Sequence, residues 1–154
     1  MRILLAIVVS LVALPALAAD LNTRPYREFA LPLHGNWCGP AYGGGPAIDG
    51  LDAACRRHDL CIQRAGEYFN CGCDLALMNE LRYRRWPSEQ LYDKARGVYE
   101  AIALLPCRDP DGQAEKLDMF TNDRLGALLS GREPPFATVG RFLKMLSEGQ
   151  RQNH

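Results

Sequence analysis

The sequence predicts an all-α fold: a small helical domain stapled by disulfides, with two antiparallel central helices and a glycine-rich loop before them. Three observations support this prediction. Apolar residues recur at helical spacing in several segments, whereas alternating strand patterns are scarce. The chain has six cysteines in 154 residues, an even number that suits disulfides. Glycines and prolines cluster at 36–46, just before the first strongly periodic segment.

Residues 1–18 have the pattern of a signal peptide. Arg2 gives a short positive start, residues 3–14 are almost wholly apolar, and Ala16–Ala18 has the A-x-A form of a cleavage site. A membrane-spanning helix is the alternative, but the apolar run is short for a bilayer and Pro15 interrupts it. The pattern therefore predicts export, with the mature protein secreted or periplasmic.

Residues 19–154 are expected to fold as one domain after cleavage. Its core is expected at about 34–107, followed by a helical C-terminal extension at 108–154. Lys and Arg together number 18, as do Asp and Glu, so the formal net charge is zero. A duplex-binding domain normally carries a basic excess. The charge balance therefore argues against a nucleic-acid partner, and no residue pattern defines an oligomeric state.

Five helices are expected, bounded by capping residues and helix breakers. Asp49 and Ser88 are candidate N-caps, whereas Gly66 and Pro87 are candidate stops. The third helix has the clearest helical period, because its apolar residues follow steps of four and three. After an irregular lead-in at 22–35 and the loop at 36–46, the expected helices lie at about 49–66, 71–87, 88–105, 114–130 and 136–147.

The last two helices have weaker signals than the first three. Asp109 to Gly112 forms a turn cluster, which is expected to precede the fourth helix. The fifth helix carries an apolar stripe, which is expected to pack on the disulfide-bonded helices. An interfacial helix, with Arg141 and Lys144 beside the stripe, is the alternative. The stripe consists of Phe136, Val139, Phe142, Leu143 and Leu146.

Export changes how the cysteines are interpreted, because an oxidising compartment favours disulfides. Six cysteines allow up to three bridges, in fifteen possible connectivities. The alternative is zinc, since Cys55, His58 and Cys61 are spaced so that one helix can turn them toward one ion. Export and the even number both oppose zinc. If Cys61 bonds Cys73, Asp74 is brought close to His58.

His58 and Asp59 stand side by side in the first expected helix, directly after the glycine-rich loop. An imidazole can act as a general base, and a carboxylate on its other ring nitrogen would orient it. Asp74 is the candidate for that carboxylate. Calcium takes six to eight oxygen ligands, including backbone carbonyls, and glycines let a loop aim several carbonyls at one point. The segment thus predicts a Ca²⁺ site beside a water-activating histidine.

Three segments, in this order within residues 36–81, resemble motifs of the secreted phospholipase A2 family. DAACRRHDLC at 52–61 resembles the active-site helix, with its C-x-x-H-D-x-C pattern. WCG at 37–39, with the glycines after it, resembles the calcium loop, and NCGCD at 70–74 resembles the C-x-C-D of the second long helix. Because so few residues separate the two long helices, the chain looks like a compact microbial or plant-like variant.

The resemblance implies calcium-dependent hydrolysis of the sn-2 ester of glycerophospholipids, which gives a fatty acid and a lysophospholipid. The substrate would lie in a phospholipid membrane surface or a micelle. His58 would activate the attacking water, and Asp74 would orient His58. The Gly39 N–H would contribute to the oxyanion site.

The resemblance also implies the cofactor, Ca²⁺, and its ligands. Asp59 would supply the carboxylate, while Trp37, Gly39 and Tyr42 would supply carbonyls. Ala41 is the alternative to Tyr42, because the loop holds one extra residue and the two ways of counting differ.

The resemblance also implies how the six cysteines pair, and the chain departs from the family pattern at one position close to them. The implied disulfides are Cys38–Cys55, Cys61–Cys73 and Cys71–Cys107. In the family a tyrosine often follows the last cysteine of the motif and bonds the catalytic aspartate. This chain has Ile62 there, so Asp74 is expected to have fewer supports.

Two other classes of function remain as alternatives. One is a non-catalytic secreted lipid- or protein-binding module on the same scaffold, and the other is a small exported disulfide domain of structural role. The first is opposed by the presence of all three of His58, Asp59 and Asp74. The enzyme is therefore the leading hypothesis.

Overall fold

The computed structural model describes residues 30–152, so the predicted signal peptide and most of the expected lead-in lie outside the described residues. This part contains five helices and no strand, with one isolated bridge between His34 and Cys38. The all-α prediction is confirmed. None of the helices at 30–152 has both the length and the apolar character that crossing a bilayer requires. The helices are α1 (Gly50–Ala65), α2 (Cys71–Tyr83), α3 (Glu89–Leu104), α4 (Pro110–Leu129) and α5 (Ala137–Gln152).

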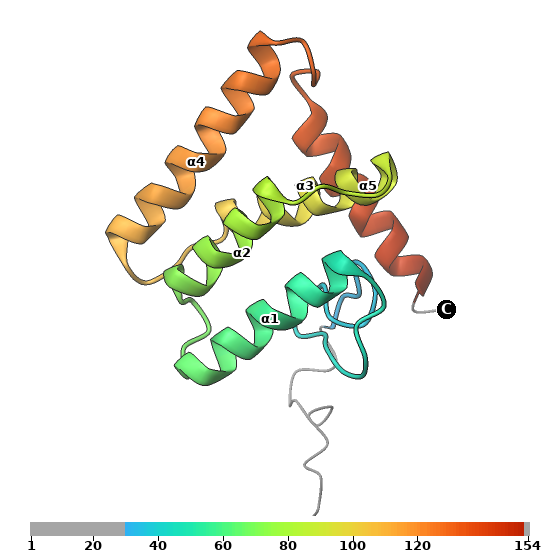
Figure 1. Cartoon of the computed structure of the whole chain (residues 1–154), viewed down its shortest axis with the longest axis vertical. Coiled ribbons are helices and arrows are strands. Elements are labelled where there is room, and N and C mark those ends of the chain that lie inside the picture. Colours follow the sequence, from blue (N-terminus) through green and yellow to red (C-terminus); the bar gives the residue numbers. More distant parts are fainter. Residues whose placement is uncertain (1–29, 153–154) are drawn as a thin grey trace, which may run out of the picture.

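The central helices α1 and α2 lie side by side and antiparallel, joined by a short turn (Figure 1). The Asp49 side chain caps α1 by accepting backbone N–H groups, and Gly66 ends the helix in the left-handed region at φ 65°. Asn70 caps α2 by accepting the Cys73 N–H. The Cys61–Cys73 disulfide then links the two helices.

Three disulfides are formed, and they are the three pairings that the resemblance implies. Cys55 and Cys61 are both bonded to other cysteines, so their sulfurs are not available as thiolate ligands and the zinc alternative is excluded. The bridges tie the glycine-rich loop to α1, α1 to α2, and α2 to the segment after α3. They are Cys38–Cys55, Cys61–Cys73 and Cys71–Cys107.

The hydrophobic core lies where α1, α2 and α3 meet, with the glycine-rich loop at one end. Trp37 closes that end of the core, and its ring is 5% exposed. The largest apolar side chains in the middle are almost fully buried. They include Leu51, Leu77, Met78, Leu81, Val98 and Tyr99. Burial of this surface is the main favourable contribution to folding.

The helix α4 begins at Pro110 rather than near Ala114, so the turn predicted at Asp109 to Gly112 is wrong. The Asp109 carboxylate accepts the Gly112 N–H at 2.9 Å and acts as the N-cap. Pro110 fits the first helical position, where its missing N–H leaves no bond unmade. The residues that suit a turn here form the first turn of a helix instead.

The apolar stripe of α5 does not pack into the core, so the packing predicted from its pattern is wrong. Four of the five stripe residues, Phe136, Val139, Phe142 and Leu143, are 50–79% exposed, and Leu146 is half-buried. The helix instead buries Met145, which packs against Gly97 of α3. A Cβ at Gly97 would be only 2.6 Å from the Met145 sulfur. The face of α5 that contacts α3 is therefore offset from the apolar stripe.

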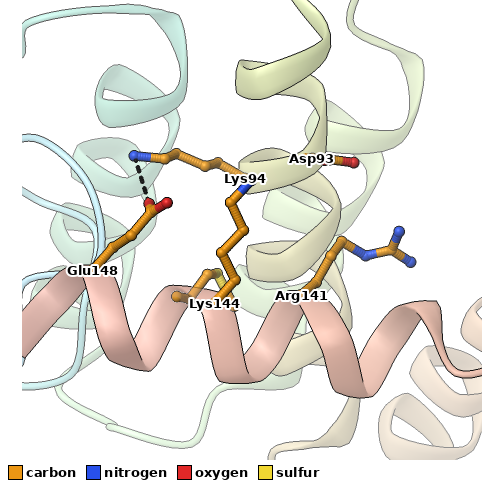
Figure 2. Close-up of a pocket in the computed structure, with 6 residues that line it drawn as sticks. Asp93, Lys94, Arg141, Lys144 and Glu148 are labelled. Carbon is orange, nitrogen blue, oxygen red and sulfur yellow. Dashed lines mark ion pairs between the residues drawn. The ribbon is translucent and has the colours of Figure 1, made fainter.

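Ion pairs explain this orientation of α5. Figure 2 shows Lys94 of α3 paired with Glu148 of α5, with Nζ and Oε2 3.2 Å apart. Arg141 of α5 pairs with Glu100 of α3 and, at 2.7 Å, with Glu133 in the turn before α5. The carboxylates of Glu100 and Glu133 are nearly buried, and buried carboxylates need a cation beside them. The face of α5 that carries Arg141 therefore turns inward.

A buried carboxylate, Asp52, holds the glycine-rich loop on α1. Its residue exposure is 0%. Oδ1 accepts the backbone N–H groups of Asn36 (3.0 Å) and Trp37 (2.7 Å), and Oδ2 accepts that of Ile48 (2.9 Å). Both ends of the loop are thus bound to one side chain. Gly35 lies directly over this carboxylate at φ 57°, and a Cβ there would be 2.4 Å from the Asp52 Cγ.

The Asp52→Ala variant is expected to lower the free energy of unfolding by about 3 kcal/mol, because three backbone donors would lose a charged acceptor. Equilibrium urea unfolding measures the change. Glu115→Ala is the matched control, since Glu115 is an exposed acid on α4. Equal unfolding midpoints for the two variants would show that Asp52 does not organise the loop.

Candidate active site

The histidine and the aspartate predicted as a catalytic pair lie in contact. His58 on α1 and Asp74 on α2 are joined by a hydrogen bond of 2.8 Å between Nε2 and Oδ1. Both side chains are nearly buried, at 15% and 8% exposure. The other ring nitrogen, Nδ1, lies 3.8 Å from Asp59 Oδ1, beyond hydrogen-bond distance. The imidazole is thus fixed through one nitrogen, and the other is left free to accept a proton from a water molecule.

The pKa of His58 is shifted by its surroundings in both directions. Burial lowers the pKa, but the negative charges of Asp59 and Asp74, together with the hydrogen bond to Asp74, outweigh burial and raise it from 6.5 to about 9. Without a cation at Asp59, the imidazole is therefore protonated at neutral pH. A protonated imidazole cannot act as a base, so catalysis by His58 requires compensation of the neighbouring negative charge.

Asp59 differs from the other buried acids of the site because one of its oxygens is unsatisfied. Within the described residues, Oδ2 of Asp59 is buried and has no hydrogen-bond partner. Leaving a buried carboxylate oxygen unpaired is costly. A hard cation would remove that cost, because carboxylate oxygens are preferred calcium ligands. The donor set at this position therefore fits Ca²⁺.

The glycine-rich loop lies against Asp59. A Cβ at Gly43 would be 3.0 Å from Asp59 Oδ2 and 3.0 Å from the Trp37 ring, so only glycine fits at this position without a shift. The Trp37 indole N–H donates to the Gly45 carbonyl at 2.9 Å, which fixes the ring beneath the loop. The Tyr42 N–H donates to the Gly39 carbonyl at 3.4 Å. Two residues of the expected ligand set, Gly39 and Tyr42, are thus in contact, and the Gly39 carbonyl already accepts one hydrogen bond.

The expected ligand set consists of one carboxylate and several carbonyls. Accordingly, no group of three or more His, Cys, Asp or Glu side chains at 30–152 is arranged to hold a metal ion. From the described residues, no donor reaches the carbonyl oxygens of Trp37, Ala41 or Tyr42. These oxygens are available to a cation, and both candidates for the third carbonyl remain open.

One residue at this site was missed by the sequence interpretation. Lys116 of α4 is fully buried, and its Nζ lies 2.5 Å from Asp74 Oδ2. The expectation that Asp74 has fewer supports, because of Ile62, is therefore wrong. A signal was present in the sequence: Lys116 is four residues before Phe120 and follows Gly112 by four, so it lies on the inward face of α4.

Comparison with known proteins gives a partial match. A stretch of 75 residues, 47% of the chain, is 38% identical to "Phospholipase A2 homolog 3" of Oryza sativa subsp. japonica. The chain is similar to a phospholipase A2 homolog. It spans about half the length of this relative, since the match covers 46% of it. No family model and no solved structure matches the chain. The partial match, the helical fold and the disulfides together indicate a phospholipase A2-like protein.

The raised pKa of His58 predicts a specific dependence of stability on pH. The protonated imidazole is stabilised in the folded state, so its contribution is fully present below pH 6.5 and is lost as the pH rises through about 9. In metal-free protein, an NMR titration of the His58 ring should give a midpoint near pH 9. The difference in free energy of unfolding between wild type and His58→Gln should shrink over the same range. A midpoint at or below 6.5 would contradict the charge environment described for His58.

Proposed function

We propose that the protein is a calcium-dependent phospholipase A2, a carboxylic ester hydrolase that cleaves the sn-2 ester of glycerophospholipids. The observation that carries the proposal is the combination of a His58–Asp74 pair with a buried, unpaired oxygen on the adjacent Asp59. The first is the arrangement of a positioned general base. The second is a charge that needs a cation. The partial similarity to a phospholipase A2 homolog supports the same conclusion.

The base in this mechanism is His58 Nδ1. It accepts a proton from a water molecule as that water attacks the ester carbonyl carbon. Asp74 accepts the hydrogen bond from Nε2–H, which keeps the proton on Nε2 and stabilises the imidazolium that forms. His58 then returns the proton to the leaving glycerol oxygen. The products are a free fatty acid and a lysophospholipid.

The calcium ligands in this proposal are the Asp59 carboxylate and the carbonyl oxygens of Trp37, Gly39 and Tyr42. When bound, the cation supplies a positive charge that polarises the ester carbonyl and offsets the Asp59 charge beside His58. The Gly39 N–H donates to the developing oxyanion. A cation at Asp59 would offset one of the charges that raise the pKa of His58, so hydrolysis and calcium binding would be coupled through these two adjacent residues.

The substrate and the location of the protein are part of the same proposal. The enzyme acts on phospholipids at a membrane surface or in micelles. Residues 1–18 act as a signal peptide, and the mature protein works in the periplasm or outside the cell. The three disulfides are consistent with that oxidising environment.

The oxidised mature protein is expected to release fatty acid from vesicles of phosphatidylcholine and phosphatidylglycerol that carry different acyl chains at sn-1 and sn-2. Release should come from sn-2, require Ca²⁺, and stop on addition of a chelator. His58→Gln should lower kcat by about 10³-fold, because the general base is lost. Mass spectrometry of the released acids measures both the rate and the position.

The matched control is Arg57→Gln, which makes the same new residue one position earlier, where the side chain is exposed and pairs with Glu80. It should retain activity. Calcium binding without ester cleavage would contradict the proposal and favour the non-catalytic binding module. Release that persists in His58→Gln would show that another residue is the base.

A further inference from the structure

The buried lysine of α4 has no role in the mechanism above. Lys116 is 0% exposed, and lysine is almost never fully buried unless its charge is paired. Removing an ammonium group from water is costly, and a well-placed anion must offset that cost. Its partner is the Asp74 carboxylate, at 2.5 Å. The position of this charge, one side chain away from the candidate base, suggests a role beyond packing.

The two oxygens of Asp74 are divided between two donors. Oδ1 accepts from His58 Nε2 at 2.8 Å, and Oδ2 accepts from Lys116 Nζ at 2.5 Å. A carboxylate held through both oxygens cannot turn about its Cβ–Cγ bond without breaking one of these contacts. If the ammonium were absent, Oδ2 would be a buried acceptor without a charged donor, which is an unfavourable state. Rotation of the Asp74 carboxylate would relieve that cost and would weaken its bond to His58.

The ammonium group is placed independently of Asp74. Lys116 Nζ also donates to the carbonyl oxygen of Leu105, at 2.8 Å. Leu105 is the C-cap of α3, where the helix dipole favours a cation. The end of α3 and the inward face of α4 therefore fix the lysine, which in turn can fix the carboxylate on α2.

We propose that Lys116 is a positioning residue of the active site: it holds the Asp74 carboxylate in the orientation that accepts the hydrogen bond from His58 Nε2. The α4 helix is then part of the catalytic apparatus. It supplies a charged donor to Asp74 in a chain that has Ile62 after the last cysteine of the motif. The inference rests on the proposed ester hydrolysis, in which Asp74 orients the base.

The test compares Lys116→Met with Lys116→Gln, which keeps a neutral donor, and with the control Lys144→Met, which removes an exposed lysine of α5. Lys116→Met should lower kcat by about 100-fold, because loss of orientation is costly even for small displacements. The KM and the calcium affinity measured by calorimetry should change less than about twofold. Lys116→Gln should recover part of kcat, and Lys144→Met should match wild type. Equal losses in kcat, KM and calcium affinity would mean that Lys116 acts only on stability.

A second readout needs neither substrate nor calcium. In metal-free protein at pH 7, the hydrogen-bonded Nε2 proton of His58 should give a low-field NMR signal. The signal should be lost in Lys116→Met and remain in Lys144→Met. An unchanged signal in Lys116→Met would overturn the inference. Wild-type protein that shows this behaviour but releases no fatty acid would instead contradict the proposed function alone.

The double variant covers the case in which Lys116→Met does not fold. Asp74→Asn combined with Lys116→Met leaves no unpaired buried charge, and such paired replacements are tolerated. If Lys116 acts through Asp74, this double variant should have the same kcat as Asp74→Asn within about twofold. A further large loss would show that Lys116 acts by another route and would contradict the inference.

Discussion

The structure depends on the need to pair a buried carboxylate, that of Asp74. The residue is 6% exposed, and an isolated charge at that depth would cost far more than the domain's net stability. Each oxygen therefore has a donor: His58 from α1 and Lys116 from α4. The Cys61–Cys73 disulfide ends one residue before Asp74 and holds α1 and α2 at the separation that this contact requires. The same interaction thus helps to assemble three helices and fixes the geometry of the candidate base.

Asp52, Asp74 and Asp59 differ in how their carboxylate oxygens are paired, and this difference indicates a different role for each. Asp52 is fully buried and accepts three backbone N–H groups, so its bonding capacity is used in holding the loop. Asp74 is paired on both oxygens with side chains and orients His58. Asp59 has one buried oxygen without a partner. Only the last has unused capacity directed into the site, which is why it is the acid proposed to bind a cation.

The sequence predicted best those helix ends that are determined by residues close together in the chain. The cap Asp49 and the stop at Gly66 gave both ends of the first helix, and Ser88 gave the start of the third, because capping involves residues only a few positions apart. The predicted stop of the second helix at Pro87 is wrong, since α2 ends at Tyr83. The pairing of His58 with Asp74 was also expected, because the resemblance implies it and a Cys61–Cys73 disulfide would bring the two residues close together. Lys116 could not be placed in this way. Its spacing from Gly112 and Phe120 indicates the inward face of α4, but its carboxylate partner lies 42 residues away in sequence and no neighbouring residue indicates that partner. The packing of α5 was predicted wrongly for the same reason. Ion pairs with residues of α3, which are distant in sequence, determine which face of α5 turns inward, and the apolar stripe does not.

In the proposed mechanism, calcium binding at Asp59 would link the geometry to the chemistry, because a cation there would offset one of the charges that raise the pKa of His58. Calorimetric titration of Ca²⁺ into the oxidised protein without lipid tests this link most directly. The account predicts one site in wild type, a loss of affinity of at least about 100-fold in Asp59→Asn, and no change in the exposed control Asp118→Asn. Equal affinity in wild type and Asp59→Asn would contradict the account, since the unpaired oxygen would then have no part in binding the cation.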